Sequence, residues 1–365
     1  MPATPADEPL LAVQNLHTQF ATAAGPARAV DGVSFTLFPR QTLAIVGESG
    51  CGKSVTSLSI LRLVGVPGKI VSGSIAYRGR ELTTLSERQM REIRGGEIAM
   101  IFQEPMTSLN PVFTVGDQIL EAINLHQKAT FTEALAIARE ALARVGISDP
   151  DRRLGEFPHQ MSGGMKQRVM IAMALACNPS VLIADEPTTA LDVTIQAQIL
   201  ELLRSLQQSA GMGILFITHD LGVVAENADV VAIMYAGQIV EYADVFELFD
   251  HPLHPYTQGL LACVPTLGNV RERLFTIRGS VPSPTAYGAG CRFLPRCTVC
   301  AGPARDRCEK ENPTLREVRA GHWVACHSAD GYVNARATIP RLTFRRPVQE
   351  AQVTVADESD LAENG

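Results

Sequence analysis

The feature that most constrains this 365-residue chain is a glycine-rich stretch, Gly47–Ser54, with the pattern G-x-x-x-x-G-K-[ST]. An apolar run, Thr42–Val46, precedes it, and an amphipathic helical pattern follows it. The glycines allow the backbone to curl so that its N–H groups point at phosphate oxygens, and the helix N-terminus adds its positive dipole. This order predicts a nucleotide-binding α/β fold, and a plain glycine turn is the alternative.

Two side chains of this loop have predicted roles in binding a nucleotide. Lys53 supplies a point charge for the β- and γ-phosphates, and the hydroxyl of Ser54 is a candidate Mg²⁺ ligand. We expect the whole loop to contact ATP, and its residues are Gly47, Glu48, Ser49, Gly50, Cys51, Gly52, Lys53 and Ser54.

A pair of carboxylates follows a second apolar run, Val181–Ala184, which is typical of a parallel strand covered on both faces. Asp185 and Glu186 then lie at the carboxyl end of that strand, where open α/β sheets bind ligands. Asp185 is expected to orient Mg²⁺ through its water shell, and Glu186 to polarise the water that attacks the γ-phosphate. An acidic turn at a strand end is the alternative.

A second candidate anion site lies between these two segments. Ser162, Gly163 and Gly164 precede a helical pattern, and a helix start offers free N–H groups. One nucleotide does not need two such sites from one subunit. Two facing subunits could use both, each completing the pocket of the other.

Composition narrows the setting in which the chain acts. The net charge of −6 argues against nucleic acid as a partner, because phosphate neutralisation needs concentrated Lys and Arg. We see neither a secretory signal at the start nor an apolar run of the roughly 20 residues that a membrane-spanning helix needs. We therefore expect a cytosolic protein with reduced thiols.

Six motifs together resemble those of the ABC-transporter ATPases, over roughly residues 10–340. Gly47–Ser54 resembles Walker A, SGGMKQ the signature, and VLIADEP Walker B; Gln103, Asp192 and His219 fall at the Q-loop, the D-loop and the switch histidine. The resemblance implies that Gln103 senses Mg²⁺ and the attacking water, and that His219 reaches the γ-phosphate. It also places Phe20 against adenine, with packing inside an edge strand as the alternative.

The resemblance also implies the domain organisation. It predicts an α/β ABC-type P-loop NTPase core, with a mixed sheet, an antiparallel β subdomain and an inserted helical subdomain, plus a small Cys-rich C-terminal extension. The expected boundaries are a flexible N-terminus at 1–9, the nucleotide-binding domain at 10–250 with its helical subdomain at about 105–165, the extension at 251–345, and a disordered tail at 346–365.

Cysteines gather in the expected extension, which resembles that of the dipeptide/oligopeptide importer ATPases. The resemblance implies that Cys291, Cys297, Cys308 and Cys326 hold a 4Fe–4S cluster, with Cys300 as an alternative third ligand. Four thiolates suit Zn²⁺ equally well by spacing, so zinc is an alternative, as is an unligated set of buried cysteines.

These features predict an ATPase subunit of an ABC importer for di- or oligopeptides, using ATP and Mg²⁺. The expected partners are a related, non-identical ATPase subunit, two transmembrane permease subunits and an extracytoplasmic peptide-binding protein. The expected location is the cytoplasmic face of the inner membrane, as a peripheral protein. Import of nickel, glutathione or another small substrate, and a soluble ABC ATPase acting on DNA or ribosomes, are the alternatives.

Overall fold

The computed structural model describes residues 8–103, 108–189, 192–263, 276–300 and 303–329. Its centre is a sheet of eight strands in the order β11-β12-β10-β9-β3-β8-β7-β6. The strands are β3 (Thr42–Val46), β6 (Ile98–Ile101), β7 (Val181–Asp185), β8 (Gly213–Thr218), β9 (Val230–Tyr235), β10 (Gln238–Asp244), β11 (Arg316–Arg319) and β12 (His322–Val324).

The middle of this sheet is parallel and fully buried. Strand β3 pairs in parallel with β8 and β9, and β7 pairs in parallel with β8 and β6. Every residue of β3, β7, β8 and β9 is buried, as expected of apolar runs covered on both faces. Strands β10, β11 and β12 continue the sheet in antiparallel fashion, so two strands from the last third of the chain join the central sheet.

A second, antiparallel sheet confirms the predicted β subdomain. Its order is β2-β1-β4-β5, from β1 (Leu11–Thr22), β2 (Gly25–Leu37), β4 (Gly68–Tyr77) and β5 (Arg80–Glu81). The inward-facing side chains of both sheets form one cluster, in which Leu16 and Phe35 meet Ile45 and Leu215.

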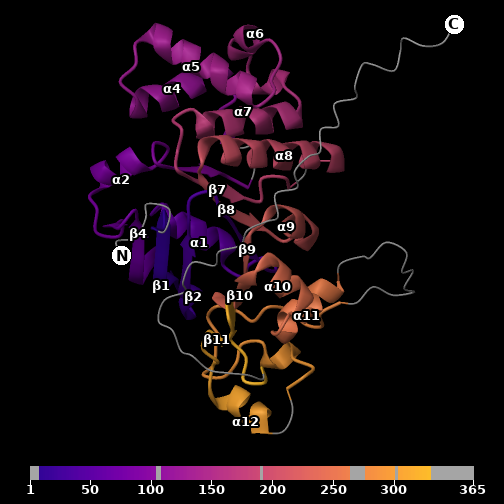
Figure 1. Ribbon diagram of the computed structural model, residues 1–365. Coiled ribbons are helices and arrows are strands. Elements are labelled where there is room, and N and C mark those ends of the chain that lie inside the picture. The colour runs from indigo at the N-terminus through magenta and orange to yellow at the C-terminus, as the bar shows by residue number, and fades with distance from the viewer. Residues whose placement is uncertain (1–7, 104–107, 190–191, 264–275, 301–302, 330–365) are drawn as a thin grey trace, which may run out of the picture.

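A layer of helices lies at the top of Figure 1, at one end of the molecule. It contains α4 (Val115–His126), α5 (Phe131–Arg144), α6 (Pro150–Leu154) and α7 (Gly163–Leu175). A capping box starts α5, because the Thr130 N–H donates to Glu133 Oε2 at 2.8 Å and the Glu133 N–H to Thr130 Oγ1 at 3.4 Å. Helix α5 packs into the helical core through Ala138 and Leu142.

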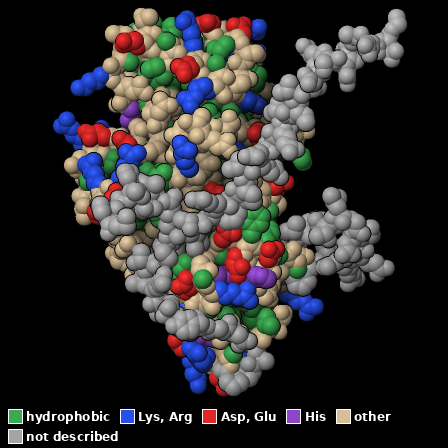
Figure 2. Space-filling view, viewed as in Figure 1, with side chains coloured by type: hydrophobic (Ala, Val, Ile, Leu, Met, Phe, Trp, Pro, Cys, Tyr) green, Lys and Arg blue, Asp and Glu red, His purple; other side chains and the backbone are tan. Residues whose placement is uncertain are grey.

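The other helices cover the sheet or belong to the C-terminal third of the chain. They are α1 (Lys53–Ile60), α2 (Glu87–Ile93), α8 (Val193–Ala210), α9 (Leu221–Asn227), α10 (Val245–Asp250), α11 (Pro255–Ala262) and α12 (Pro303–Lys310), with short 3₁₀ turns at Pro158–Gln160 and Leu294–Arg296. None of the described helices is long and apolar enough to cross a membrane. Acidic and basic side chains are interspersed over the face seen in Figure 2.

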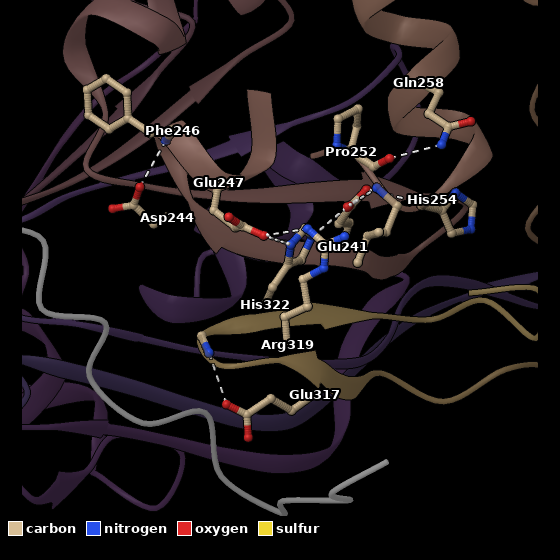
Figure 3. A network of polar contacts seen from close by, with 12 residues as sticks. Glu241, Asp244, Phe246, Glu247, Pro252, His254, Gln258, Glu317, Arg319 and His322 are labelled. Carbon is tan, nitrogen blue, oxygen red and sulfur yellow. Dashed lines mark hydrogen bonds and ion pairs between the residues drawn. The ribbon is translucent and has the colours of Figure 1, made fainter. Parts of the chain in front are cut away.

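A buried polar network fastens the end of the described chain to the central sheet (Figure 3). His322 on β12 lies 2.7 Å from Glu241 on β10, and both side chains are fully buried. Glu241 also accepts hydrogen bonds from the backbone N–H groups of Leu253 and His254, at 2.7 and 3.0 Å. One carboxylate therefore ties β12 and the start of α11 to β10.

His254 gives this region a predicted dependence on pH. Its Nδ1 accepts the Tyr256 N–H at 3.0 Å and caps α11, and burial lowers its pKa to about 4. In the unfolded chain this histidine takes up a proton near pH 6.5. We therefore expect the free energy of unfolding to fall by about 2 kcal/mol between pH 7.5 and pH 5. Denaturant unfolding at both pH values measures the loss. Asparagine in His254→Asn keeps a capping acceptor that does not titrate, so the free energy of unfolding of this variant should fall less between the two pH values. An equal fall in the variant and the wild type contradicts the assignment of the pH dependence to His254.

Candidate active site

Four segments place the predicted site residues along one edge of the central sheet. The phosphate loop follows β3, Asp185 and Glu186 end β7, and His219 follows β8. Gln103 lies two residues after β6. Since β3, β8, β7 and β6 are adjacent and parallel, their carboxyl ends meet on one side, where α/β sheets bind ligands.

The phosphate loop has the tight geometry that its glycines predict. A Cβ on Gly47 would lie 2.2 Å from the carbonyl oxygen of Met234, and one on Gly52, whose φ is +110°, would lie 2.3 Å from that of Ala29. Both positions therefore require glycine. The ammonium group of Lys53 is folded over the loop and donates to the carbonyl oxygens of Gly47 and Glu48, at 2.7 and 3.1 Å.

Ser54 and Asp185 form a group that fits Mg²⁺. The Ser54 hydroxyl donates to Asp185 Oδ1 at 3.2 Å, and hydroxyl and carboxylate oxygens are ligands that Mg²⁺ prefers. Burial is the main cause that raises the pKa of Asp185; nearby Glu186 adds to the rise, whereas Ser54 opposes it. A cation beside this carboxylate would offset its desolvation, which is what a metal ligand at this position needs.

Glu186 is the centre of the candidate catalytic group. Gln103 Nε2 donates to Glu186 Oε2 at 3.1 Å, and His219 Nδ1 lies 3.4 Å from Glu186 Oε1. The backbone of Glu186 has a φ of +46°, a strained conformation for a residue with a side chain. The structure thus brings together all three predicted catalytic side chains.

Two further residues hold this turn, and sequence analysis did not single them out. Thr189 Oγ1 donates to Glu186 Oε2 at 2.9 Å. Gln167, fully buried on α7, donates through Nε2 to the carbonyl oxygen of Pro187 at 2.6 Å. Thr189 lies three residues after Glu186, a spacing at which hydroxyls commonly close turns. Gln167 is the last residue of the SGGMKQ motif, for which sequence analysis predicted no contact with this turn.

The second predicted anion site, Ser162 to Gly164, does not lie at the phosphate loop of its own chain. Ser162 caps α7 and accepts the Met165 N–H at 3.3 Å, and Gly163 and Gly164 form the first turn. Helix α7 belongs to the layer at the top of Figure 1, whereas α1 lies below β7 and β8. Asp192 caps α8 by accepting the Ile195 N–H at 3.0 Å. No hydrogen bond or ion pair found among the described residues joins this group to the phosphate loop.

Phe20 lies on β1, which is an inner strand of its sheet, between β2 and β4, and not the edge strand of the alternative interpretation. It is half-buried on β1 and pairs with Gly68 on β4. A Cβ on Gly68 would lie 2.5 Å from Phe20 Cε1, so the ring lies directly over this glycine. Stacking of Phe20 on adenine stays a prediction.

The expected 4Fe–4S cluster is wrong for this structure. Cys291, Cys297, Cys300, Cys308 and Cys326 line a single cavity of about 10 Å³, room for about one water molecule. The sulfur atoms of Cys300 and Cys308 are 3.2 Å apart, closer than the roughly 3.8 Å that bonds of 2.3 Å to one tetrahedral ion require. In the described part of the chain, no group of three or more His, Cys, Asp or Glu is placed to hold a metal ion, which also leaves the zinc alternative without support.

Cys300, Cys308 and Cys326 are buried, whereas Cys291 and Cys297 are partly buried. Burial raises the pKa of Cys291, Cys308 and Cys326, which favours the neutral thiol over the thiolate that binds metals. Cys291 and Cys297 pack against the core cluster that contains Tyr256 and Phe293. An unligated set of cysteines stays a prediction.

Fold and site together define a P-loop ATPase with an inserted helical layer. Comparisons with known proteins extend this assignment. Residues 30–189 match the ABC transporter family, and residues 240–303 match the C-terminal region of oligopeptide/dipeptide transporters. The chain belongs to the peptide-importer family of ABC transporter ATP-binding subunits, and it is an ATPase. This confirms both the predicted family and the predicted fold class.

Individual relatives show how much of the chain is shared. A probable peptide ABC transporter ATP-binding protein of Sinorhizobium fredii, y4tR, is 53% identical over 336 residues, which is 92% of this chain and 99% of that protein. The oligopeptide transport ATP-binding protein AppD of Bacillus subtilis is 52% identical over 318 residues, 87% and 96% of the two chains. The dimeric ATP-binding cassette MJ0796 bound to ADP and Pi has a TM-score of 0.58 and 25% identity, covering 64% of this chain and 98% of that one.

Proposed function

We propose that this chain hydrolyses ATP to power an importer of di- or oligopeptides across the cytoplasmic membrane. One observation carries the proposal: the chain joins a complete ATPase cassette to a C-terminal region that matches oligopeptide/dipeptide transporters at residues 240–303. The relatives y4tR and AppD, named for peptide transport, are similar to this chain over 87% or more of its length.

We assign ATP binding to the phosphate loop, and Mg²⁺ binding to Ser54 and Asp185. Backbone N–H groups of Gly47–Ser54 and the ammonium of Lys53 bind the triphosphate, with Lys53 turning from its present carbonyl partners to the phosphates. Ser54 and Asp185, with Gln103, hold Mg²⁺, which neutralises phosphate charge when bound. Phe20 stays our candidate for the adenine contact.

We assign the chemical step to Glu186. Its carboxylate accepts a proton from water as the water oxygen bonds to the γ-phosphorus and the bond to the leaving ADP breaks. Gln103 and Thr189 each contact Glu186 Oε2 and fix its orientation. His219 is 62% exposed in its side chain, beside Glu186 Oε1, and is free to turn its imidazole toward the γ-phosphate.

We assign the second half-site to a facing cassette. Ser162, Gly163 and Gly164 have no hydrogen bond to their own phosphate loop among the described residues, so we assign them to the nucleotide of a neighbour, with Asp192 at the same contact. The proposed neighbour is a related, non-identical ATPase subunit. Two permease subunits and an extracytoplasmic peptide-binding protein complete the proposed assembly, with this chain peripheral on the cytoplasmic face of the inner membrane.

Reconstituted vesicles test the proposal. The vesicles contain this chain with its partner cassette, the permeases and the binding protein, and labelled di- and oligopeptides are offered from the binding-protein side. We expect uptake that requires ATP on the cassette side and stops with Glu186→Gln. Uptake of nickel or glutathione in place of peptide contradicts the substrate class, and uptake without ATP contradicts the function.

A further inference from the structure

A residue of the phosphate loop is bound by the C-terminal extension. The carboxylate of Glu48, which follows the first glycine of the loop, accepts two hydrogen bonds from Arg296, one on each oxygen and both at 3.0 Å. This is the bidentate geometry in which arginine binds carboxylates most strongly. Glu48 and Arg296 are 248 residues apart in the chain.

Arg296 is itself held firmly in place. Its side chain is only 4% exposed, against 30% for Glu48. Its Nε donates to the carbonyl oxygen of Arg278 at 2.9 Å, and its guanidinium lies over the ring of Tyr235, 5.7 Å from the ring centroid. The extension therefore presents a fixed positive charge to the loop.

The same segment of chain also holds the backbone of Glu48. The Glu48 N–H donates to the hydroxyl of Tyr256, a fully buried residue of α11, at 3.0 Å. Tyr256 packs against Tyr235 and Phe293, with ring centroids 4.7 and 5.5 Å away. Both the main chain and the side chain of Glu48 thus have partners beyond residue 250.

Because Glu48 lies in the phosphate loop, the charge of its side chain affects the binding of ATP. An unpaired carboxylate in a phosphate-binding loop repels the triphosphate, and this repulsion grows with phosphate charge. The bidentate pair with Arg296 compensates the charge of Glu48 and fixes the loop at the same time.

We propose that Arg296 is a positioning residue for ATP: it neutralises Glu48 and holds the phosphate loop in its binding conformation, so that the C-terminal extension contributes to nucleotide affinity. The inference rests on the ATP site of the proposed function. It adds a residue outside the matched ABC transporter region, residues 30–189, to the determinants of that site.

Binding of ATP and ADP to four forms of the full chain tests the inference: wild type, Arg296→Gln, Glu48→Gln and the double variant. Arg296→Gln should weaken ATP binding by about tenfold, the effect of one unpaired carboxylate near a triphosphate, and should weaken ADP binding less. The double variant should recover most of the ATP affinity, because it leaves no carboxylate to repel phosphate.

A matched control separates two effects: an unpaired charge on the phosphate loop, and a general loss of stability of the C-terminal extension. Asp31 on β2 pairs with Arg292 of the same extension without touching the loop. Asp31→Asn should therefore lower thermal stability and leave ATP affinity within about twofold. Equal affinity in Arg296→Gln and wild type overturns the inference, as does a loss that is equal for ATP and ADP and is not rescued by Glu48→Gln. A wild-type chain that binds no ATP contradicts the proposed function instead.

Discussion

A Glu186→Gln variant should bind ATP almost as well as the wild type and hydrolyse it about 10²- to 10⁴-fold more slowly, the usual contribution of a general base. The amide has nearly the shape of the carboxylate and keeps an oxygen that Gln103 and Thr189 can contact, at the positions now 3.1 and 2.9 Å away. It cannot accept the proton of the attacking water. Single-turnover hydrolysis and equilibrium ATP binding, measured on one preparation, separate the two effects.

Lys53→Ala provides the contrasting variant. The substitution removes an ammonium charge that acts on both bound ATP and the transition state. ATP binding should therefore weaken by about 10- to 100-fold, the cost of one charged hydrogen bond. The rate of hydrolysis should fall as well. Normal turnover in Glu186→Gln means that another group is the base. Loss of binding in Glu186→Gln, matching that in Lys53→Ala, means that the residue supports the site rather than the chemistry.

Gly163→Ala should impair hydrolysis by the assembled cassettes and leave the chain itself intact. Gly163 opens α7, its φ lies outside the left-handed region, and an added Cβ has no neighbour within 4 Å. Folding and ATP binding should therefore stay unchanged. A methyl group at a close-packed contact with a facing nucleotide costs about 1–3 kcal/mol, so hydrolysis by the assembled cassettes should fall about 10- to 100-fold.

Gly65→Ala is the matched control, because a Cβ there also meets nothing within 4 Å and the backbone is equally permissive. Gly164 suits the test less well, since its Cβ would press on Ile195 of the same chain at 3.1 Å. Unchanged hydrolysis in Gly163→Ala, measured with the partner cassette present, contradicts a role for the α7 N-terminus in the neighbour's site.

The sequence alone predicted the parts of the site that local chemistry specifies. Glycine spacing identified Gly47–Ser54 because only glycine fits where a Cβ would meet backbone oxygens at 2.2–2.3 Å. Apolar runs with carboxylates at their ends identified Asp185 and Glu186, because buried parallel strands are recognisable and their ends bind ligands. Family motifs placed Gln103 and His219, and the structure brings both to Glu186.

The contacts that support the site depend on long-range packing and left no local pattern. Arg296 and Tyr256 reach Glu48 across 248 and 208 residues, and Gln167 reaches the turn after Glu186 from a helix of another layer. Arg296 and Tyr256 are ordinary polar residues in their own segments, and Gln167, although it ends the SGGMKQ motif, had no predicted partner. For the cysteines, the sequence predicted a site that the structure does not contain. Their positions suggested ligands of a 4Fe–4S cluster, whereas in the folded chain they surround a cavity with no room for a cluster.

We propose that this chain carries two half-sites for ATP that only a facing cassette completes. ATP turnover by the isolated chain, verified as monomeric throughout the assay, tests this proposal most directly when measured before and after addition of the partner cassette. We expect very slow turnover by the monomer, a large gain on assembly, and loss of that gain in Gly163→Ala. Full turnover by the wild-type monomer, with Gly163→Ala equally active, would contradict it.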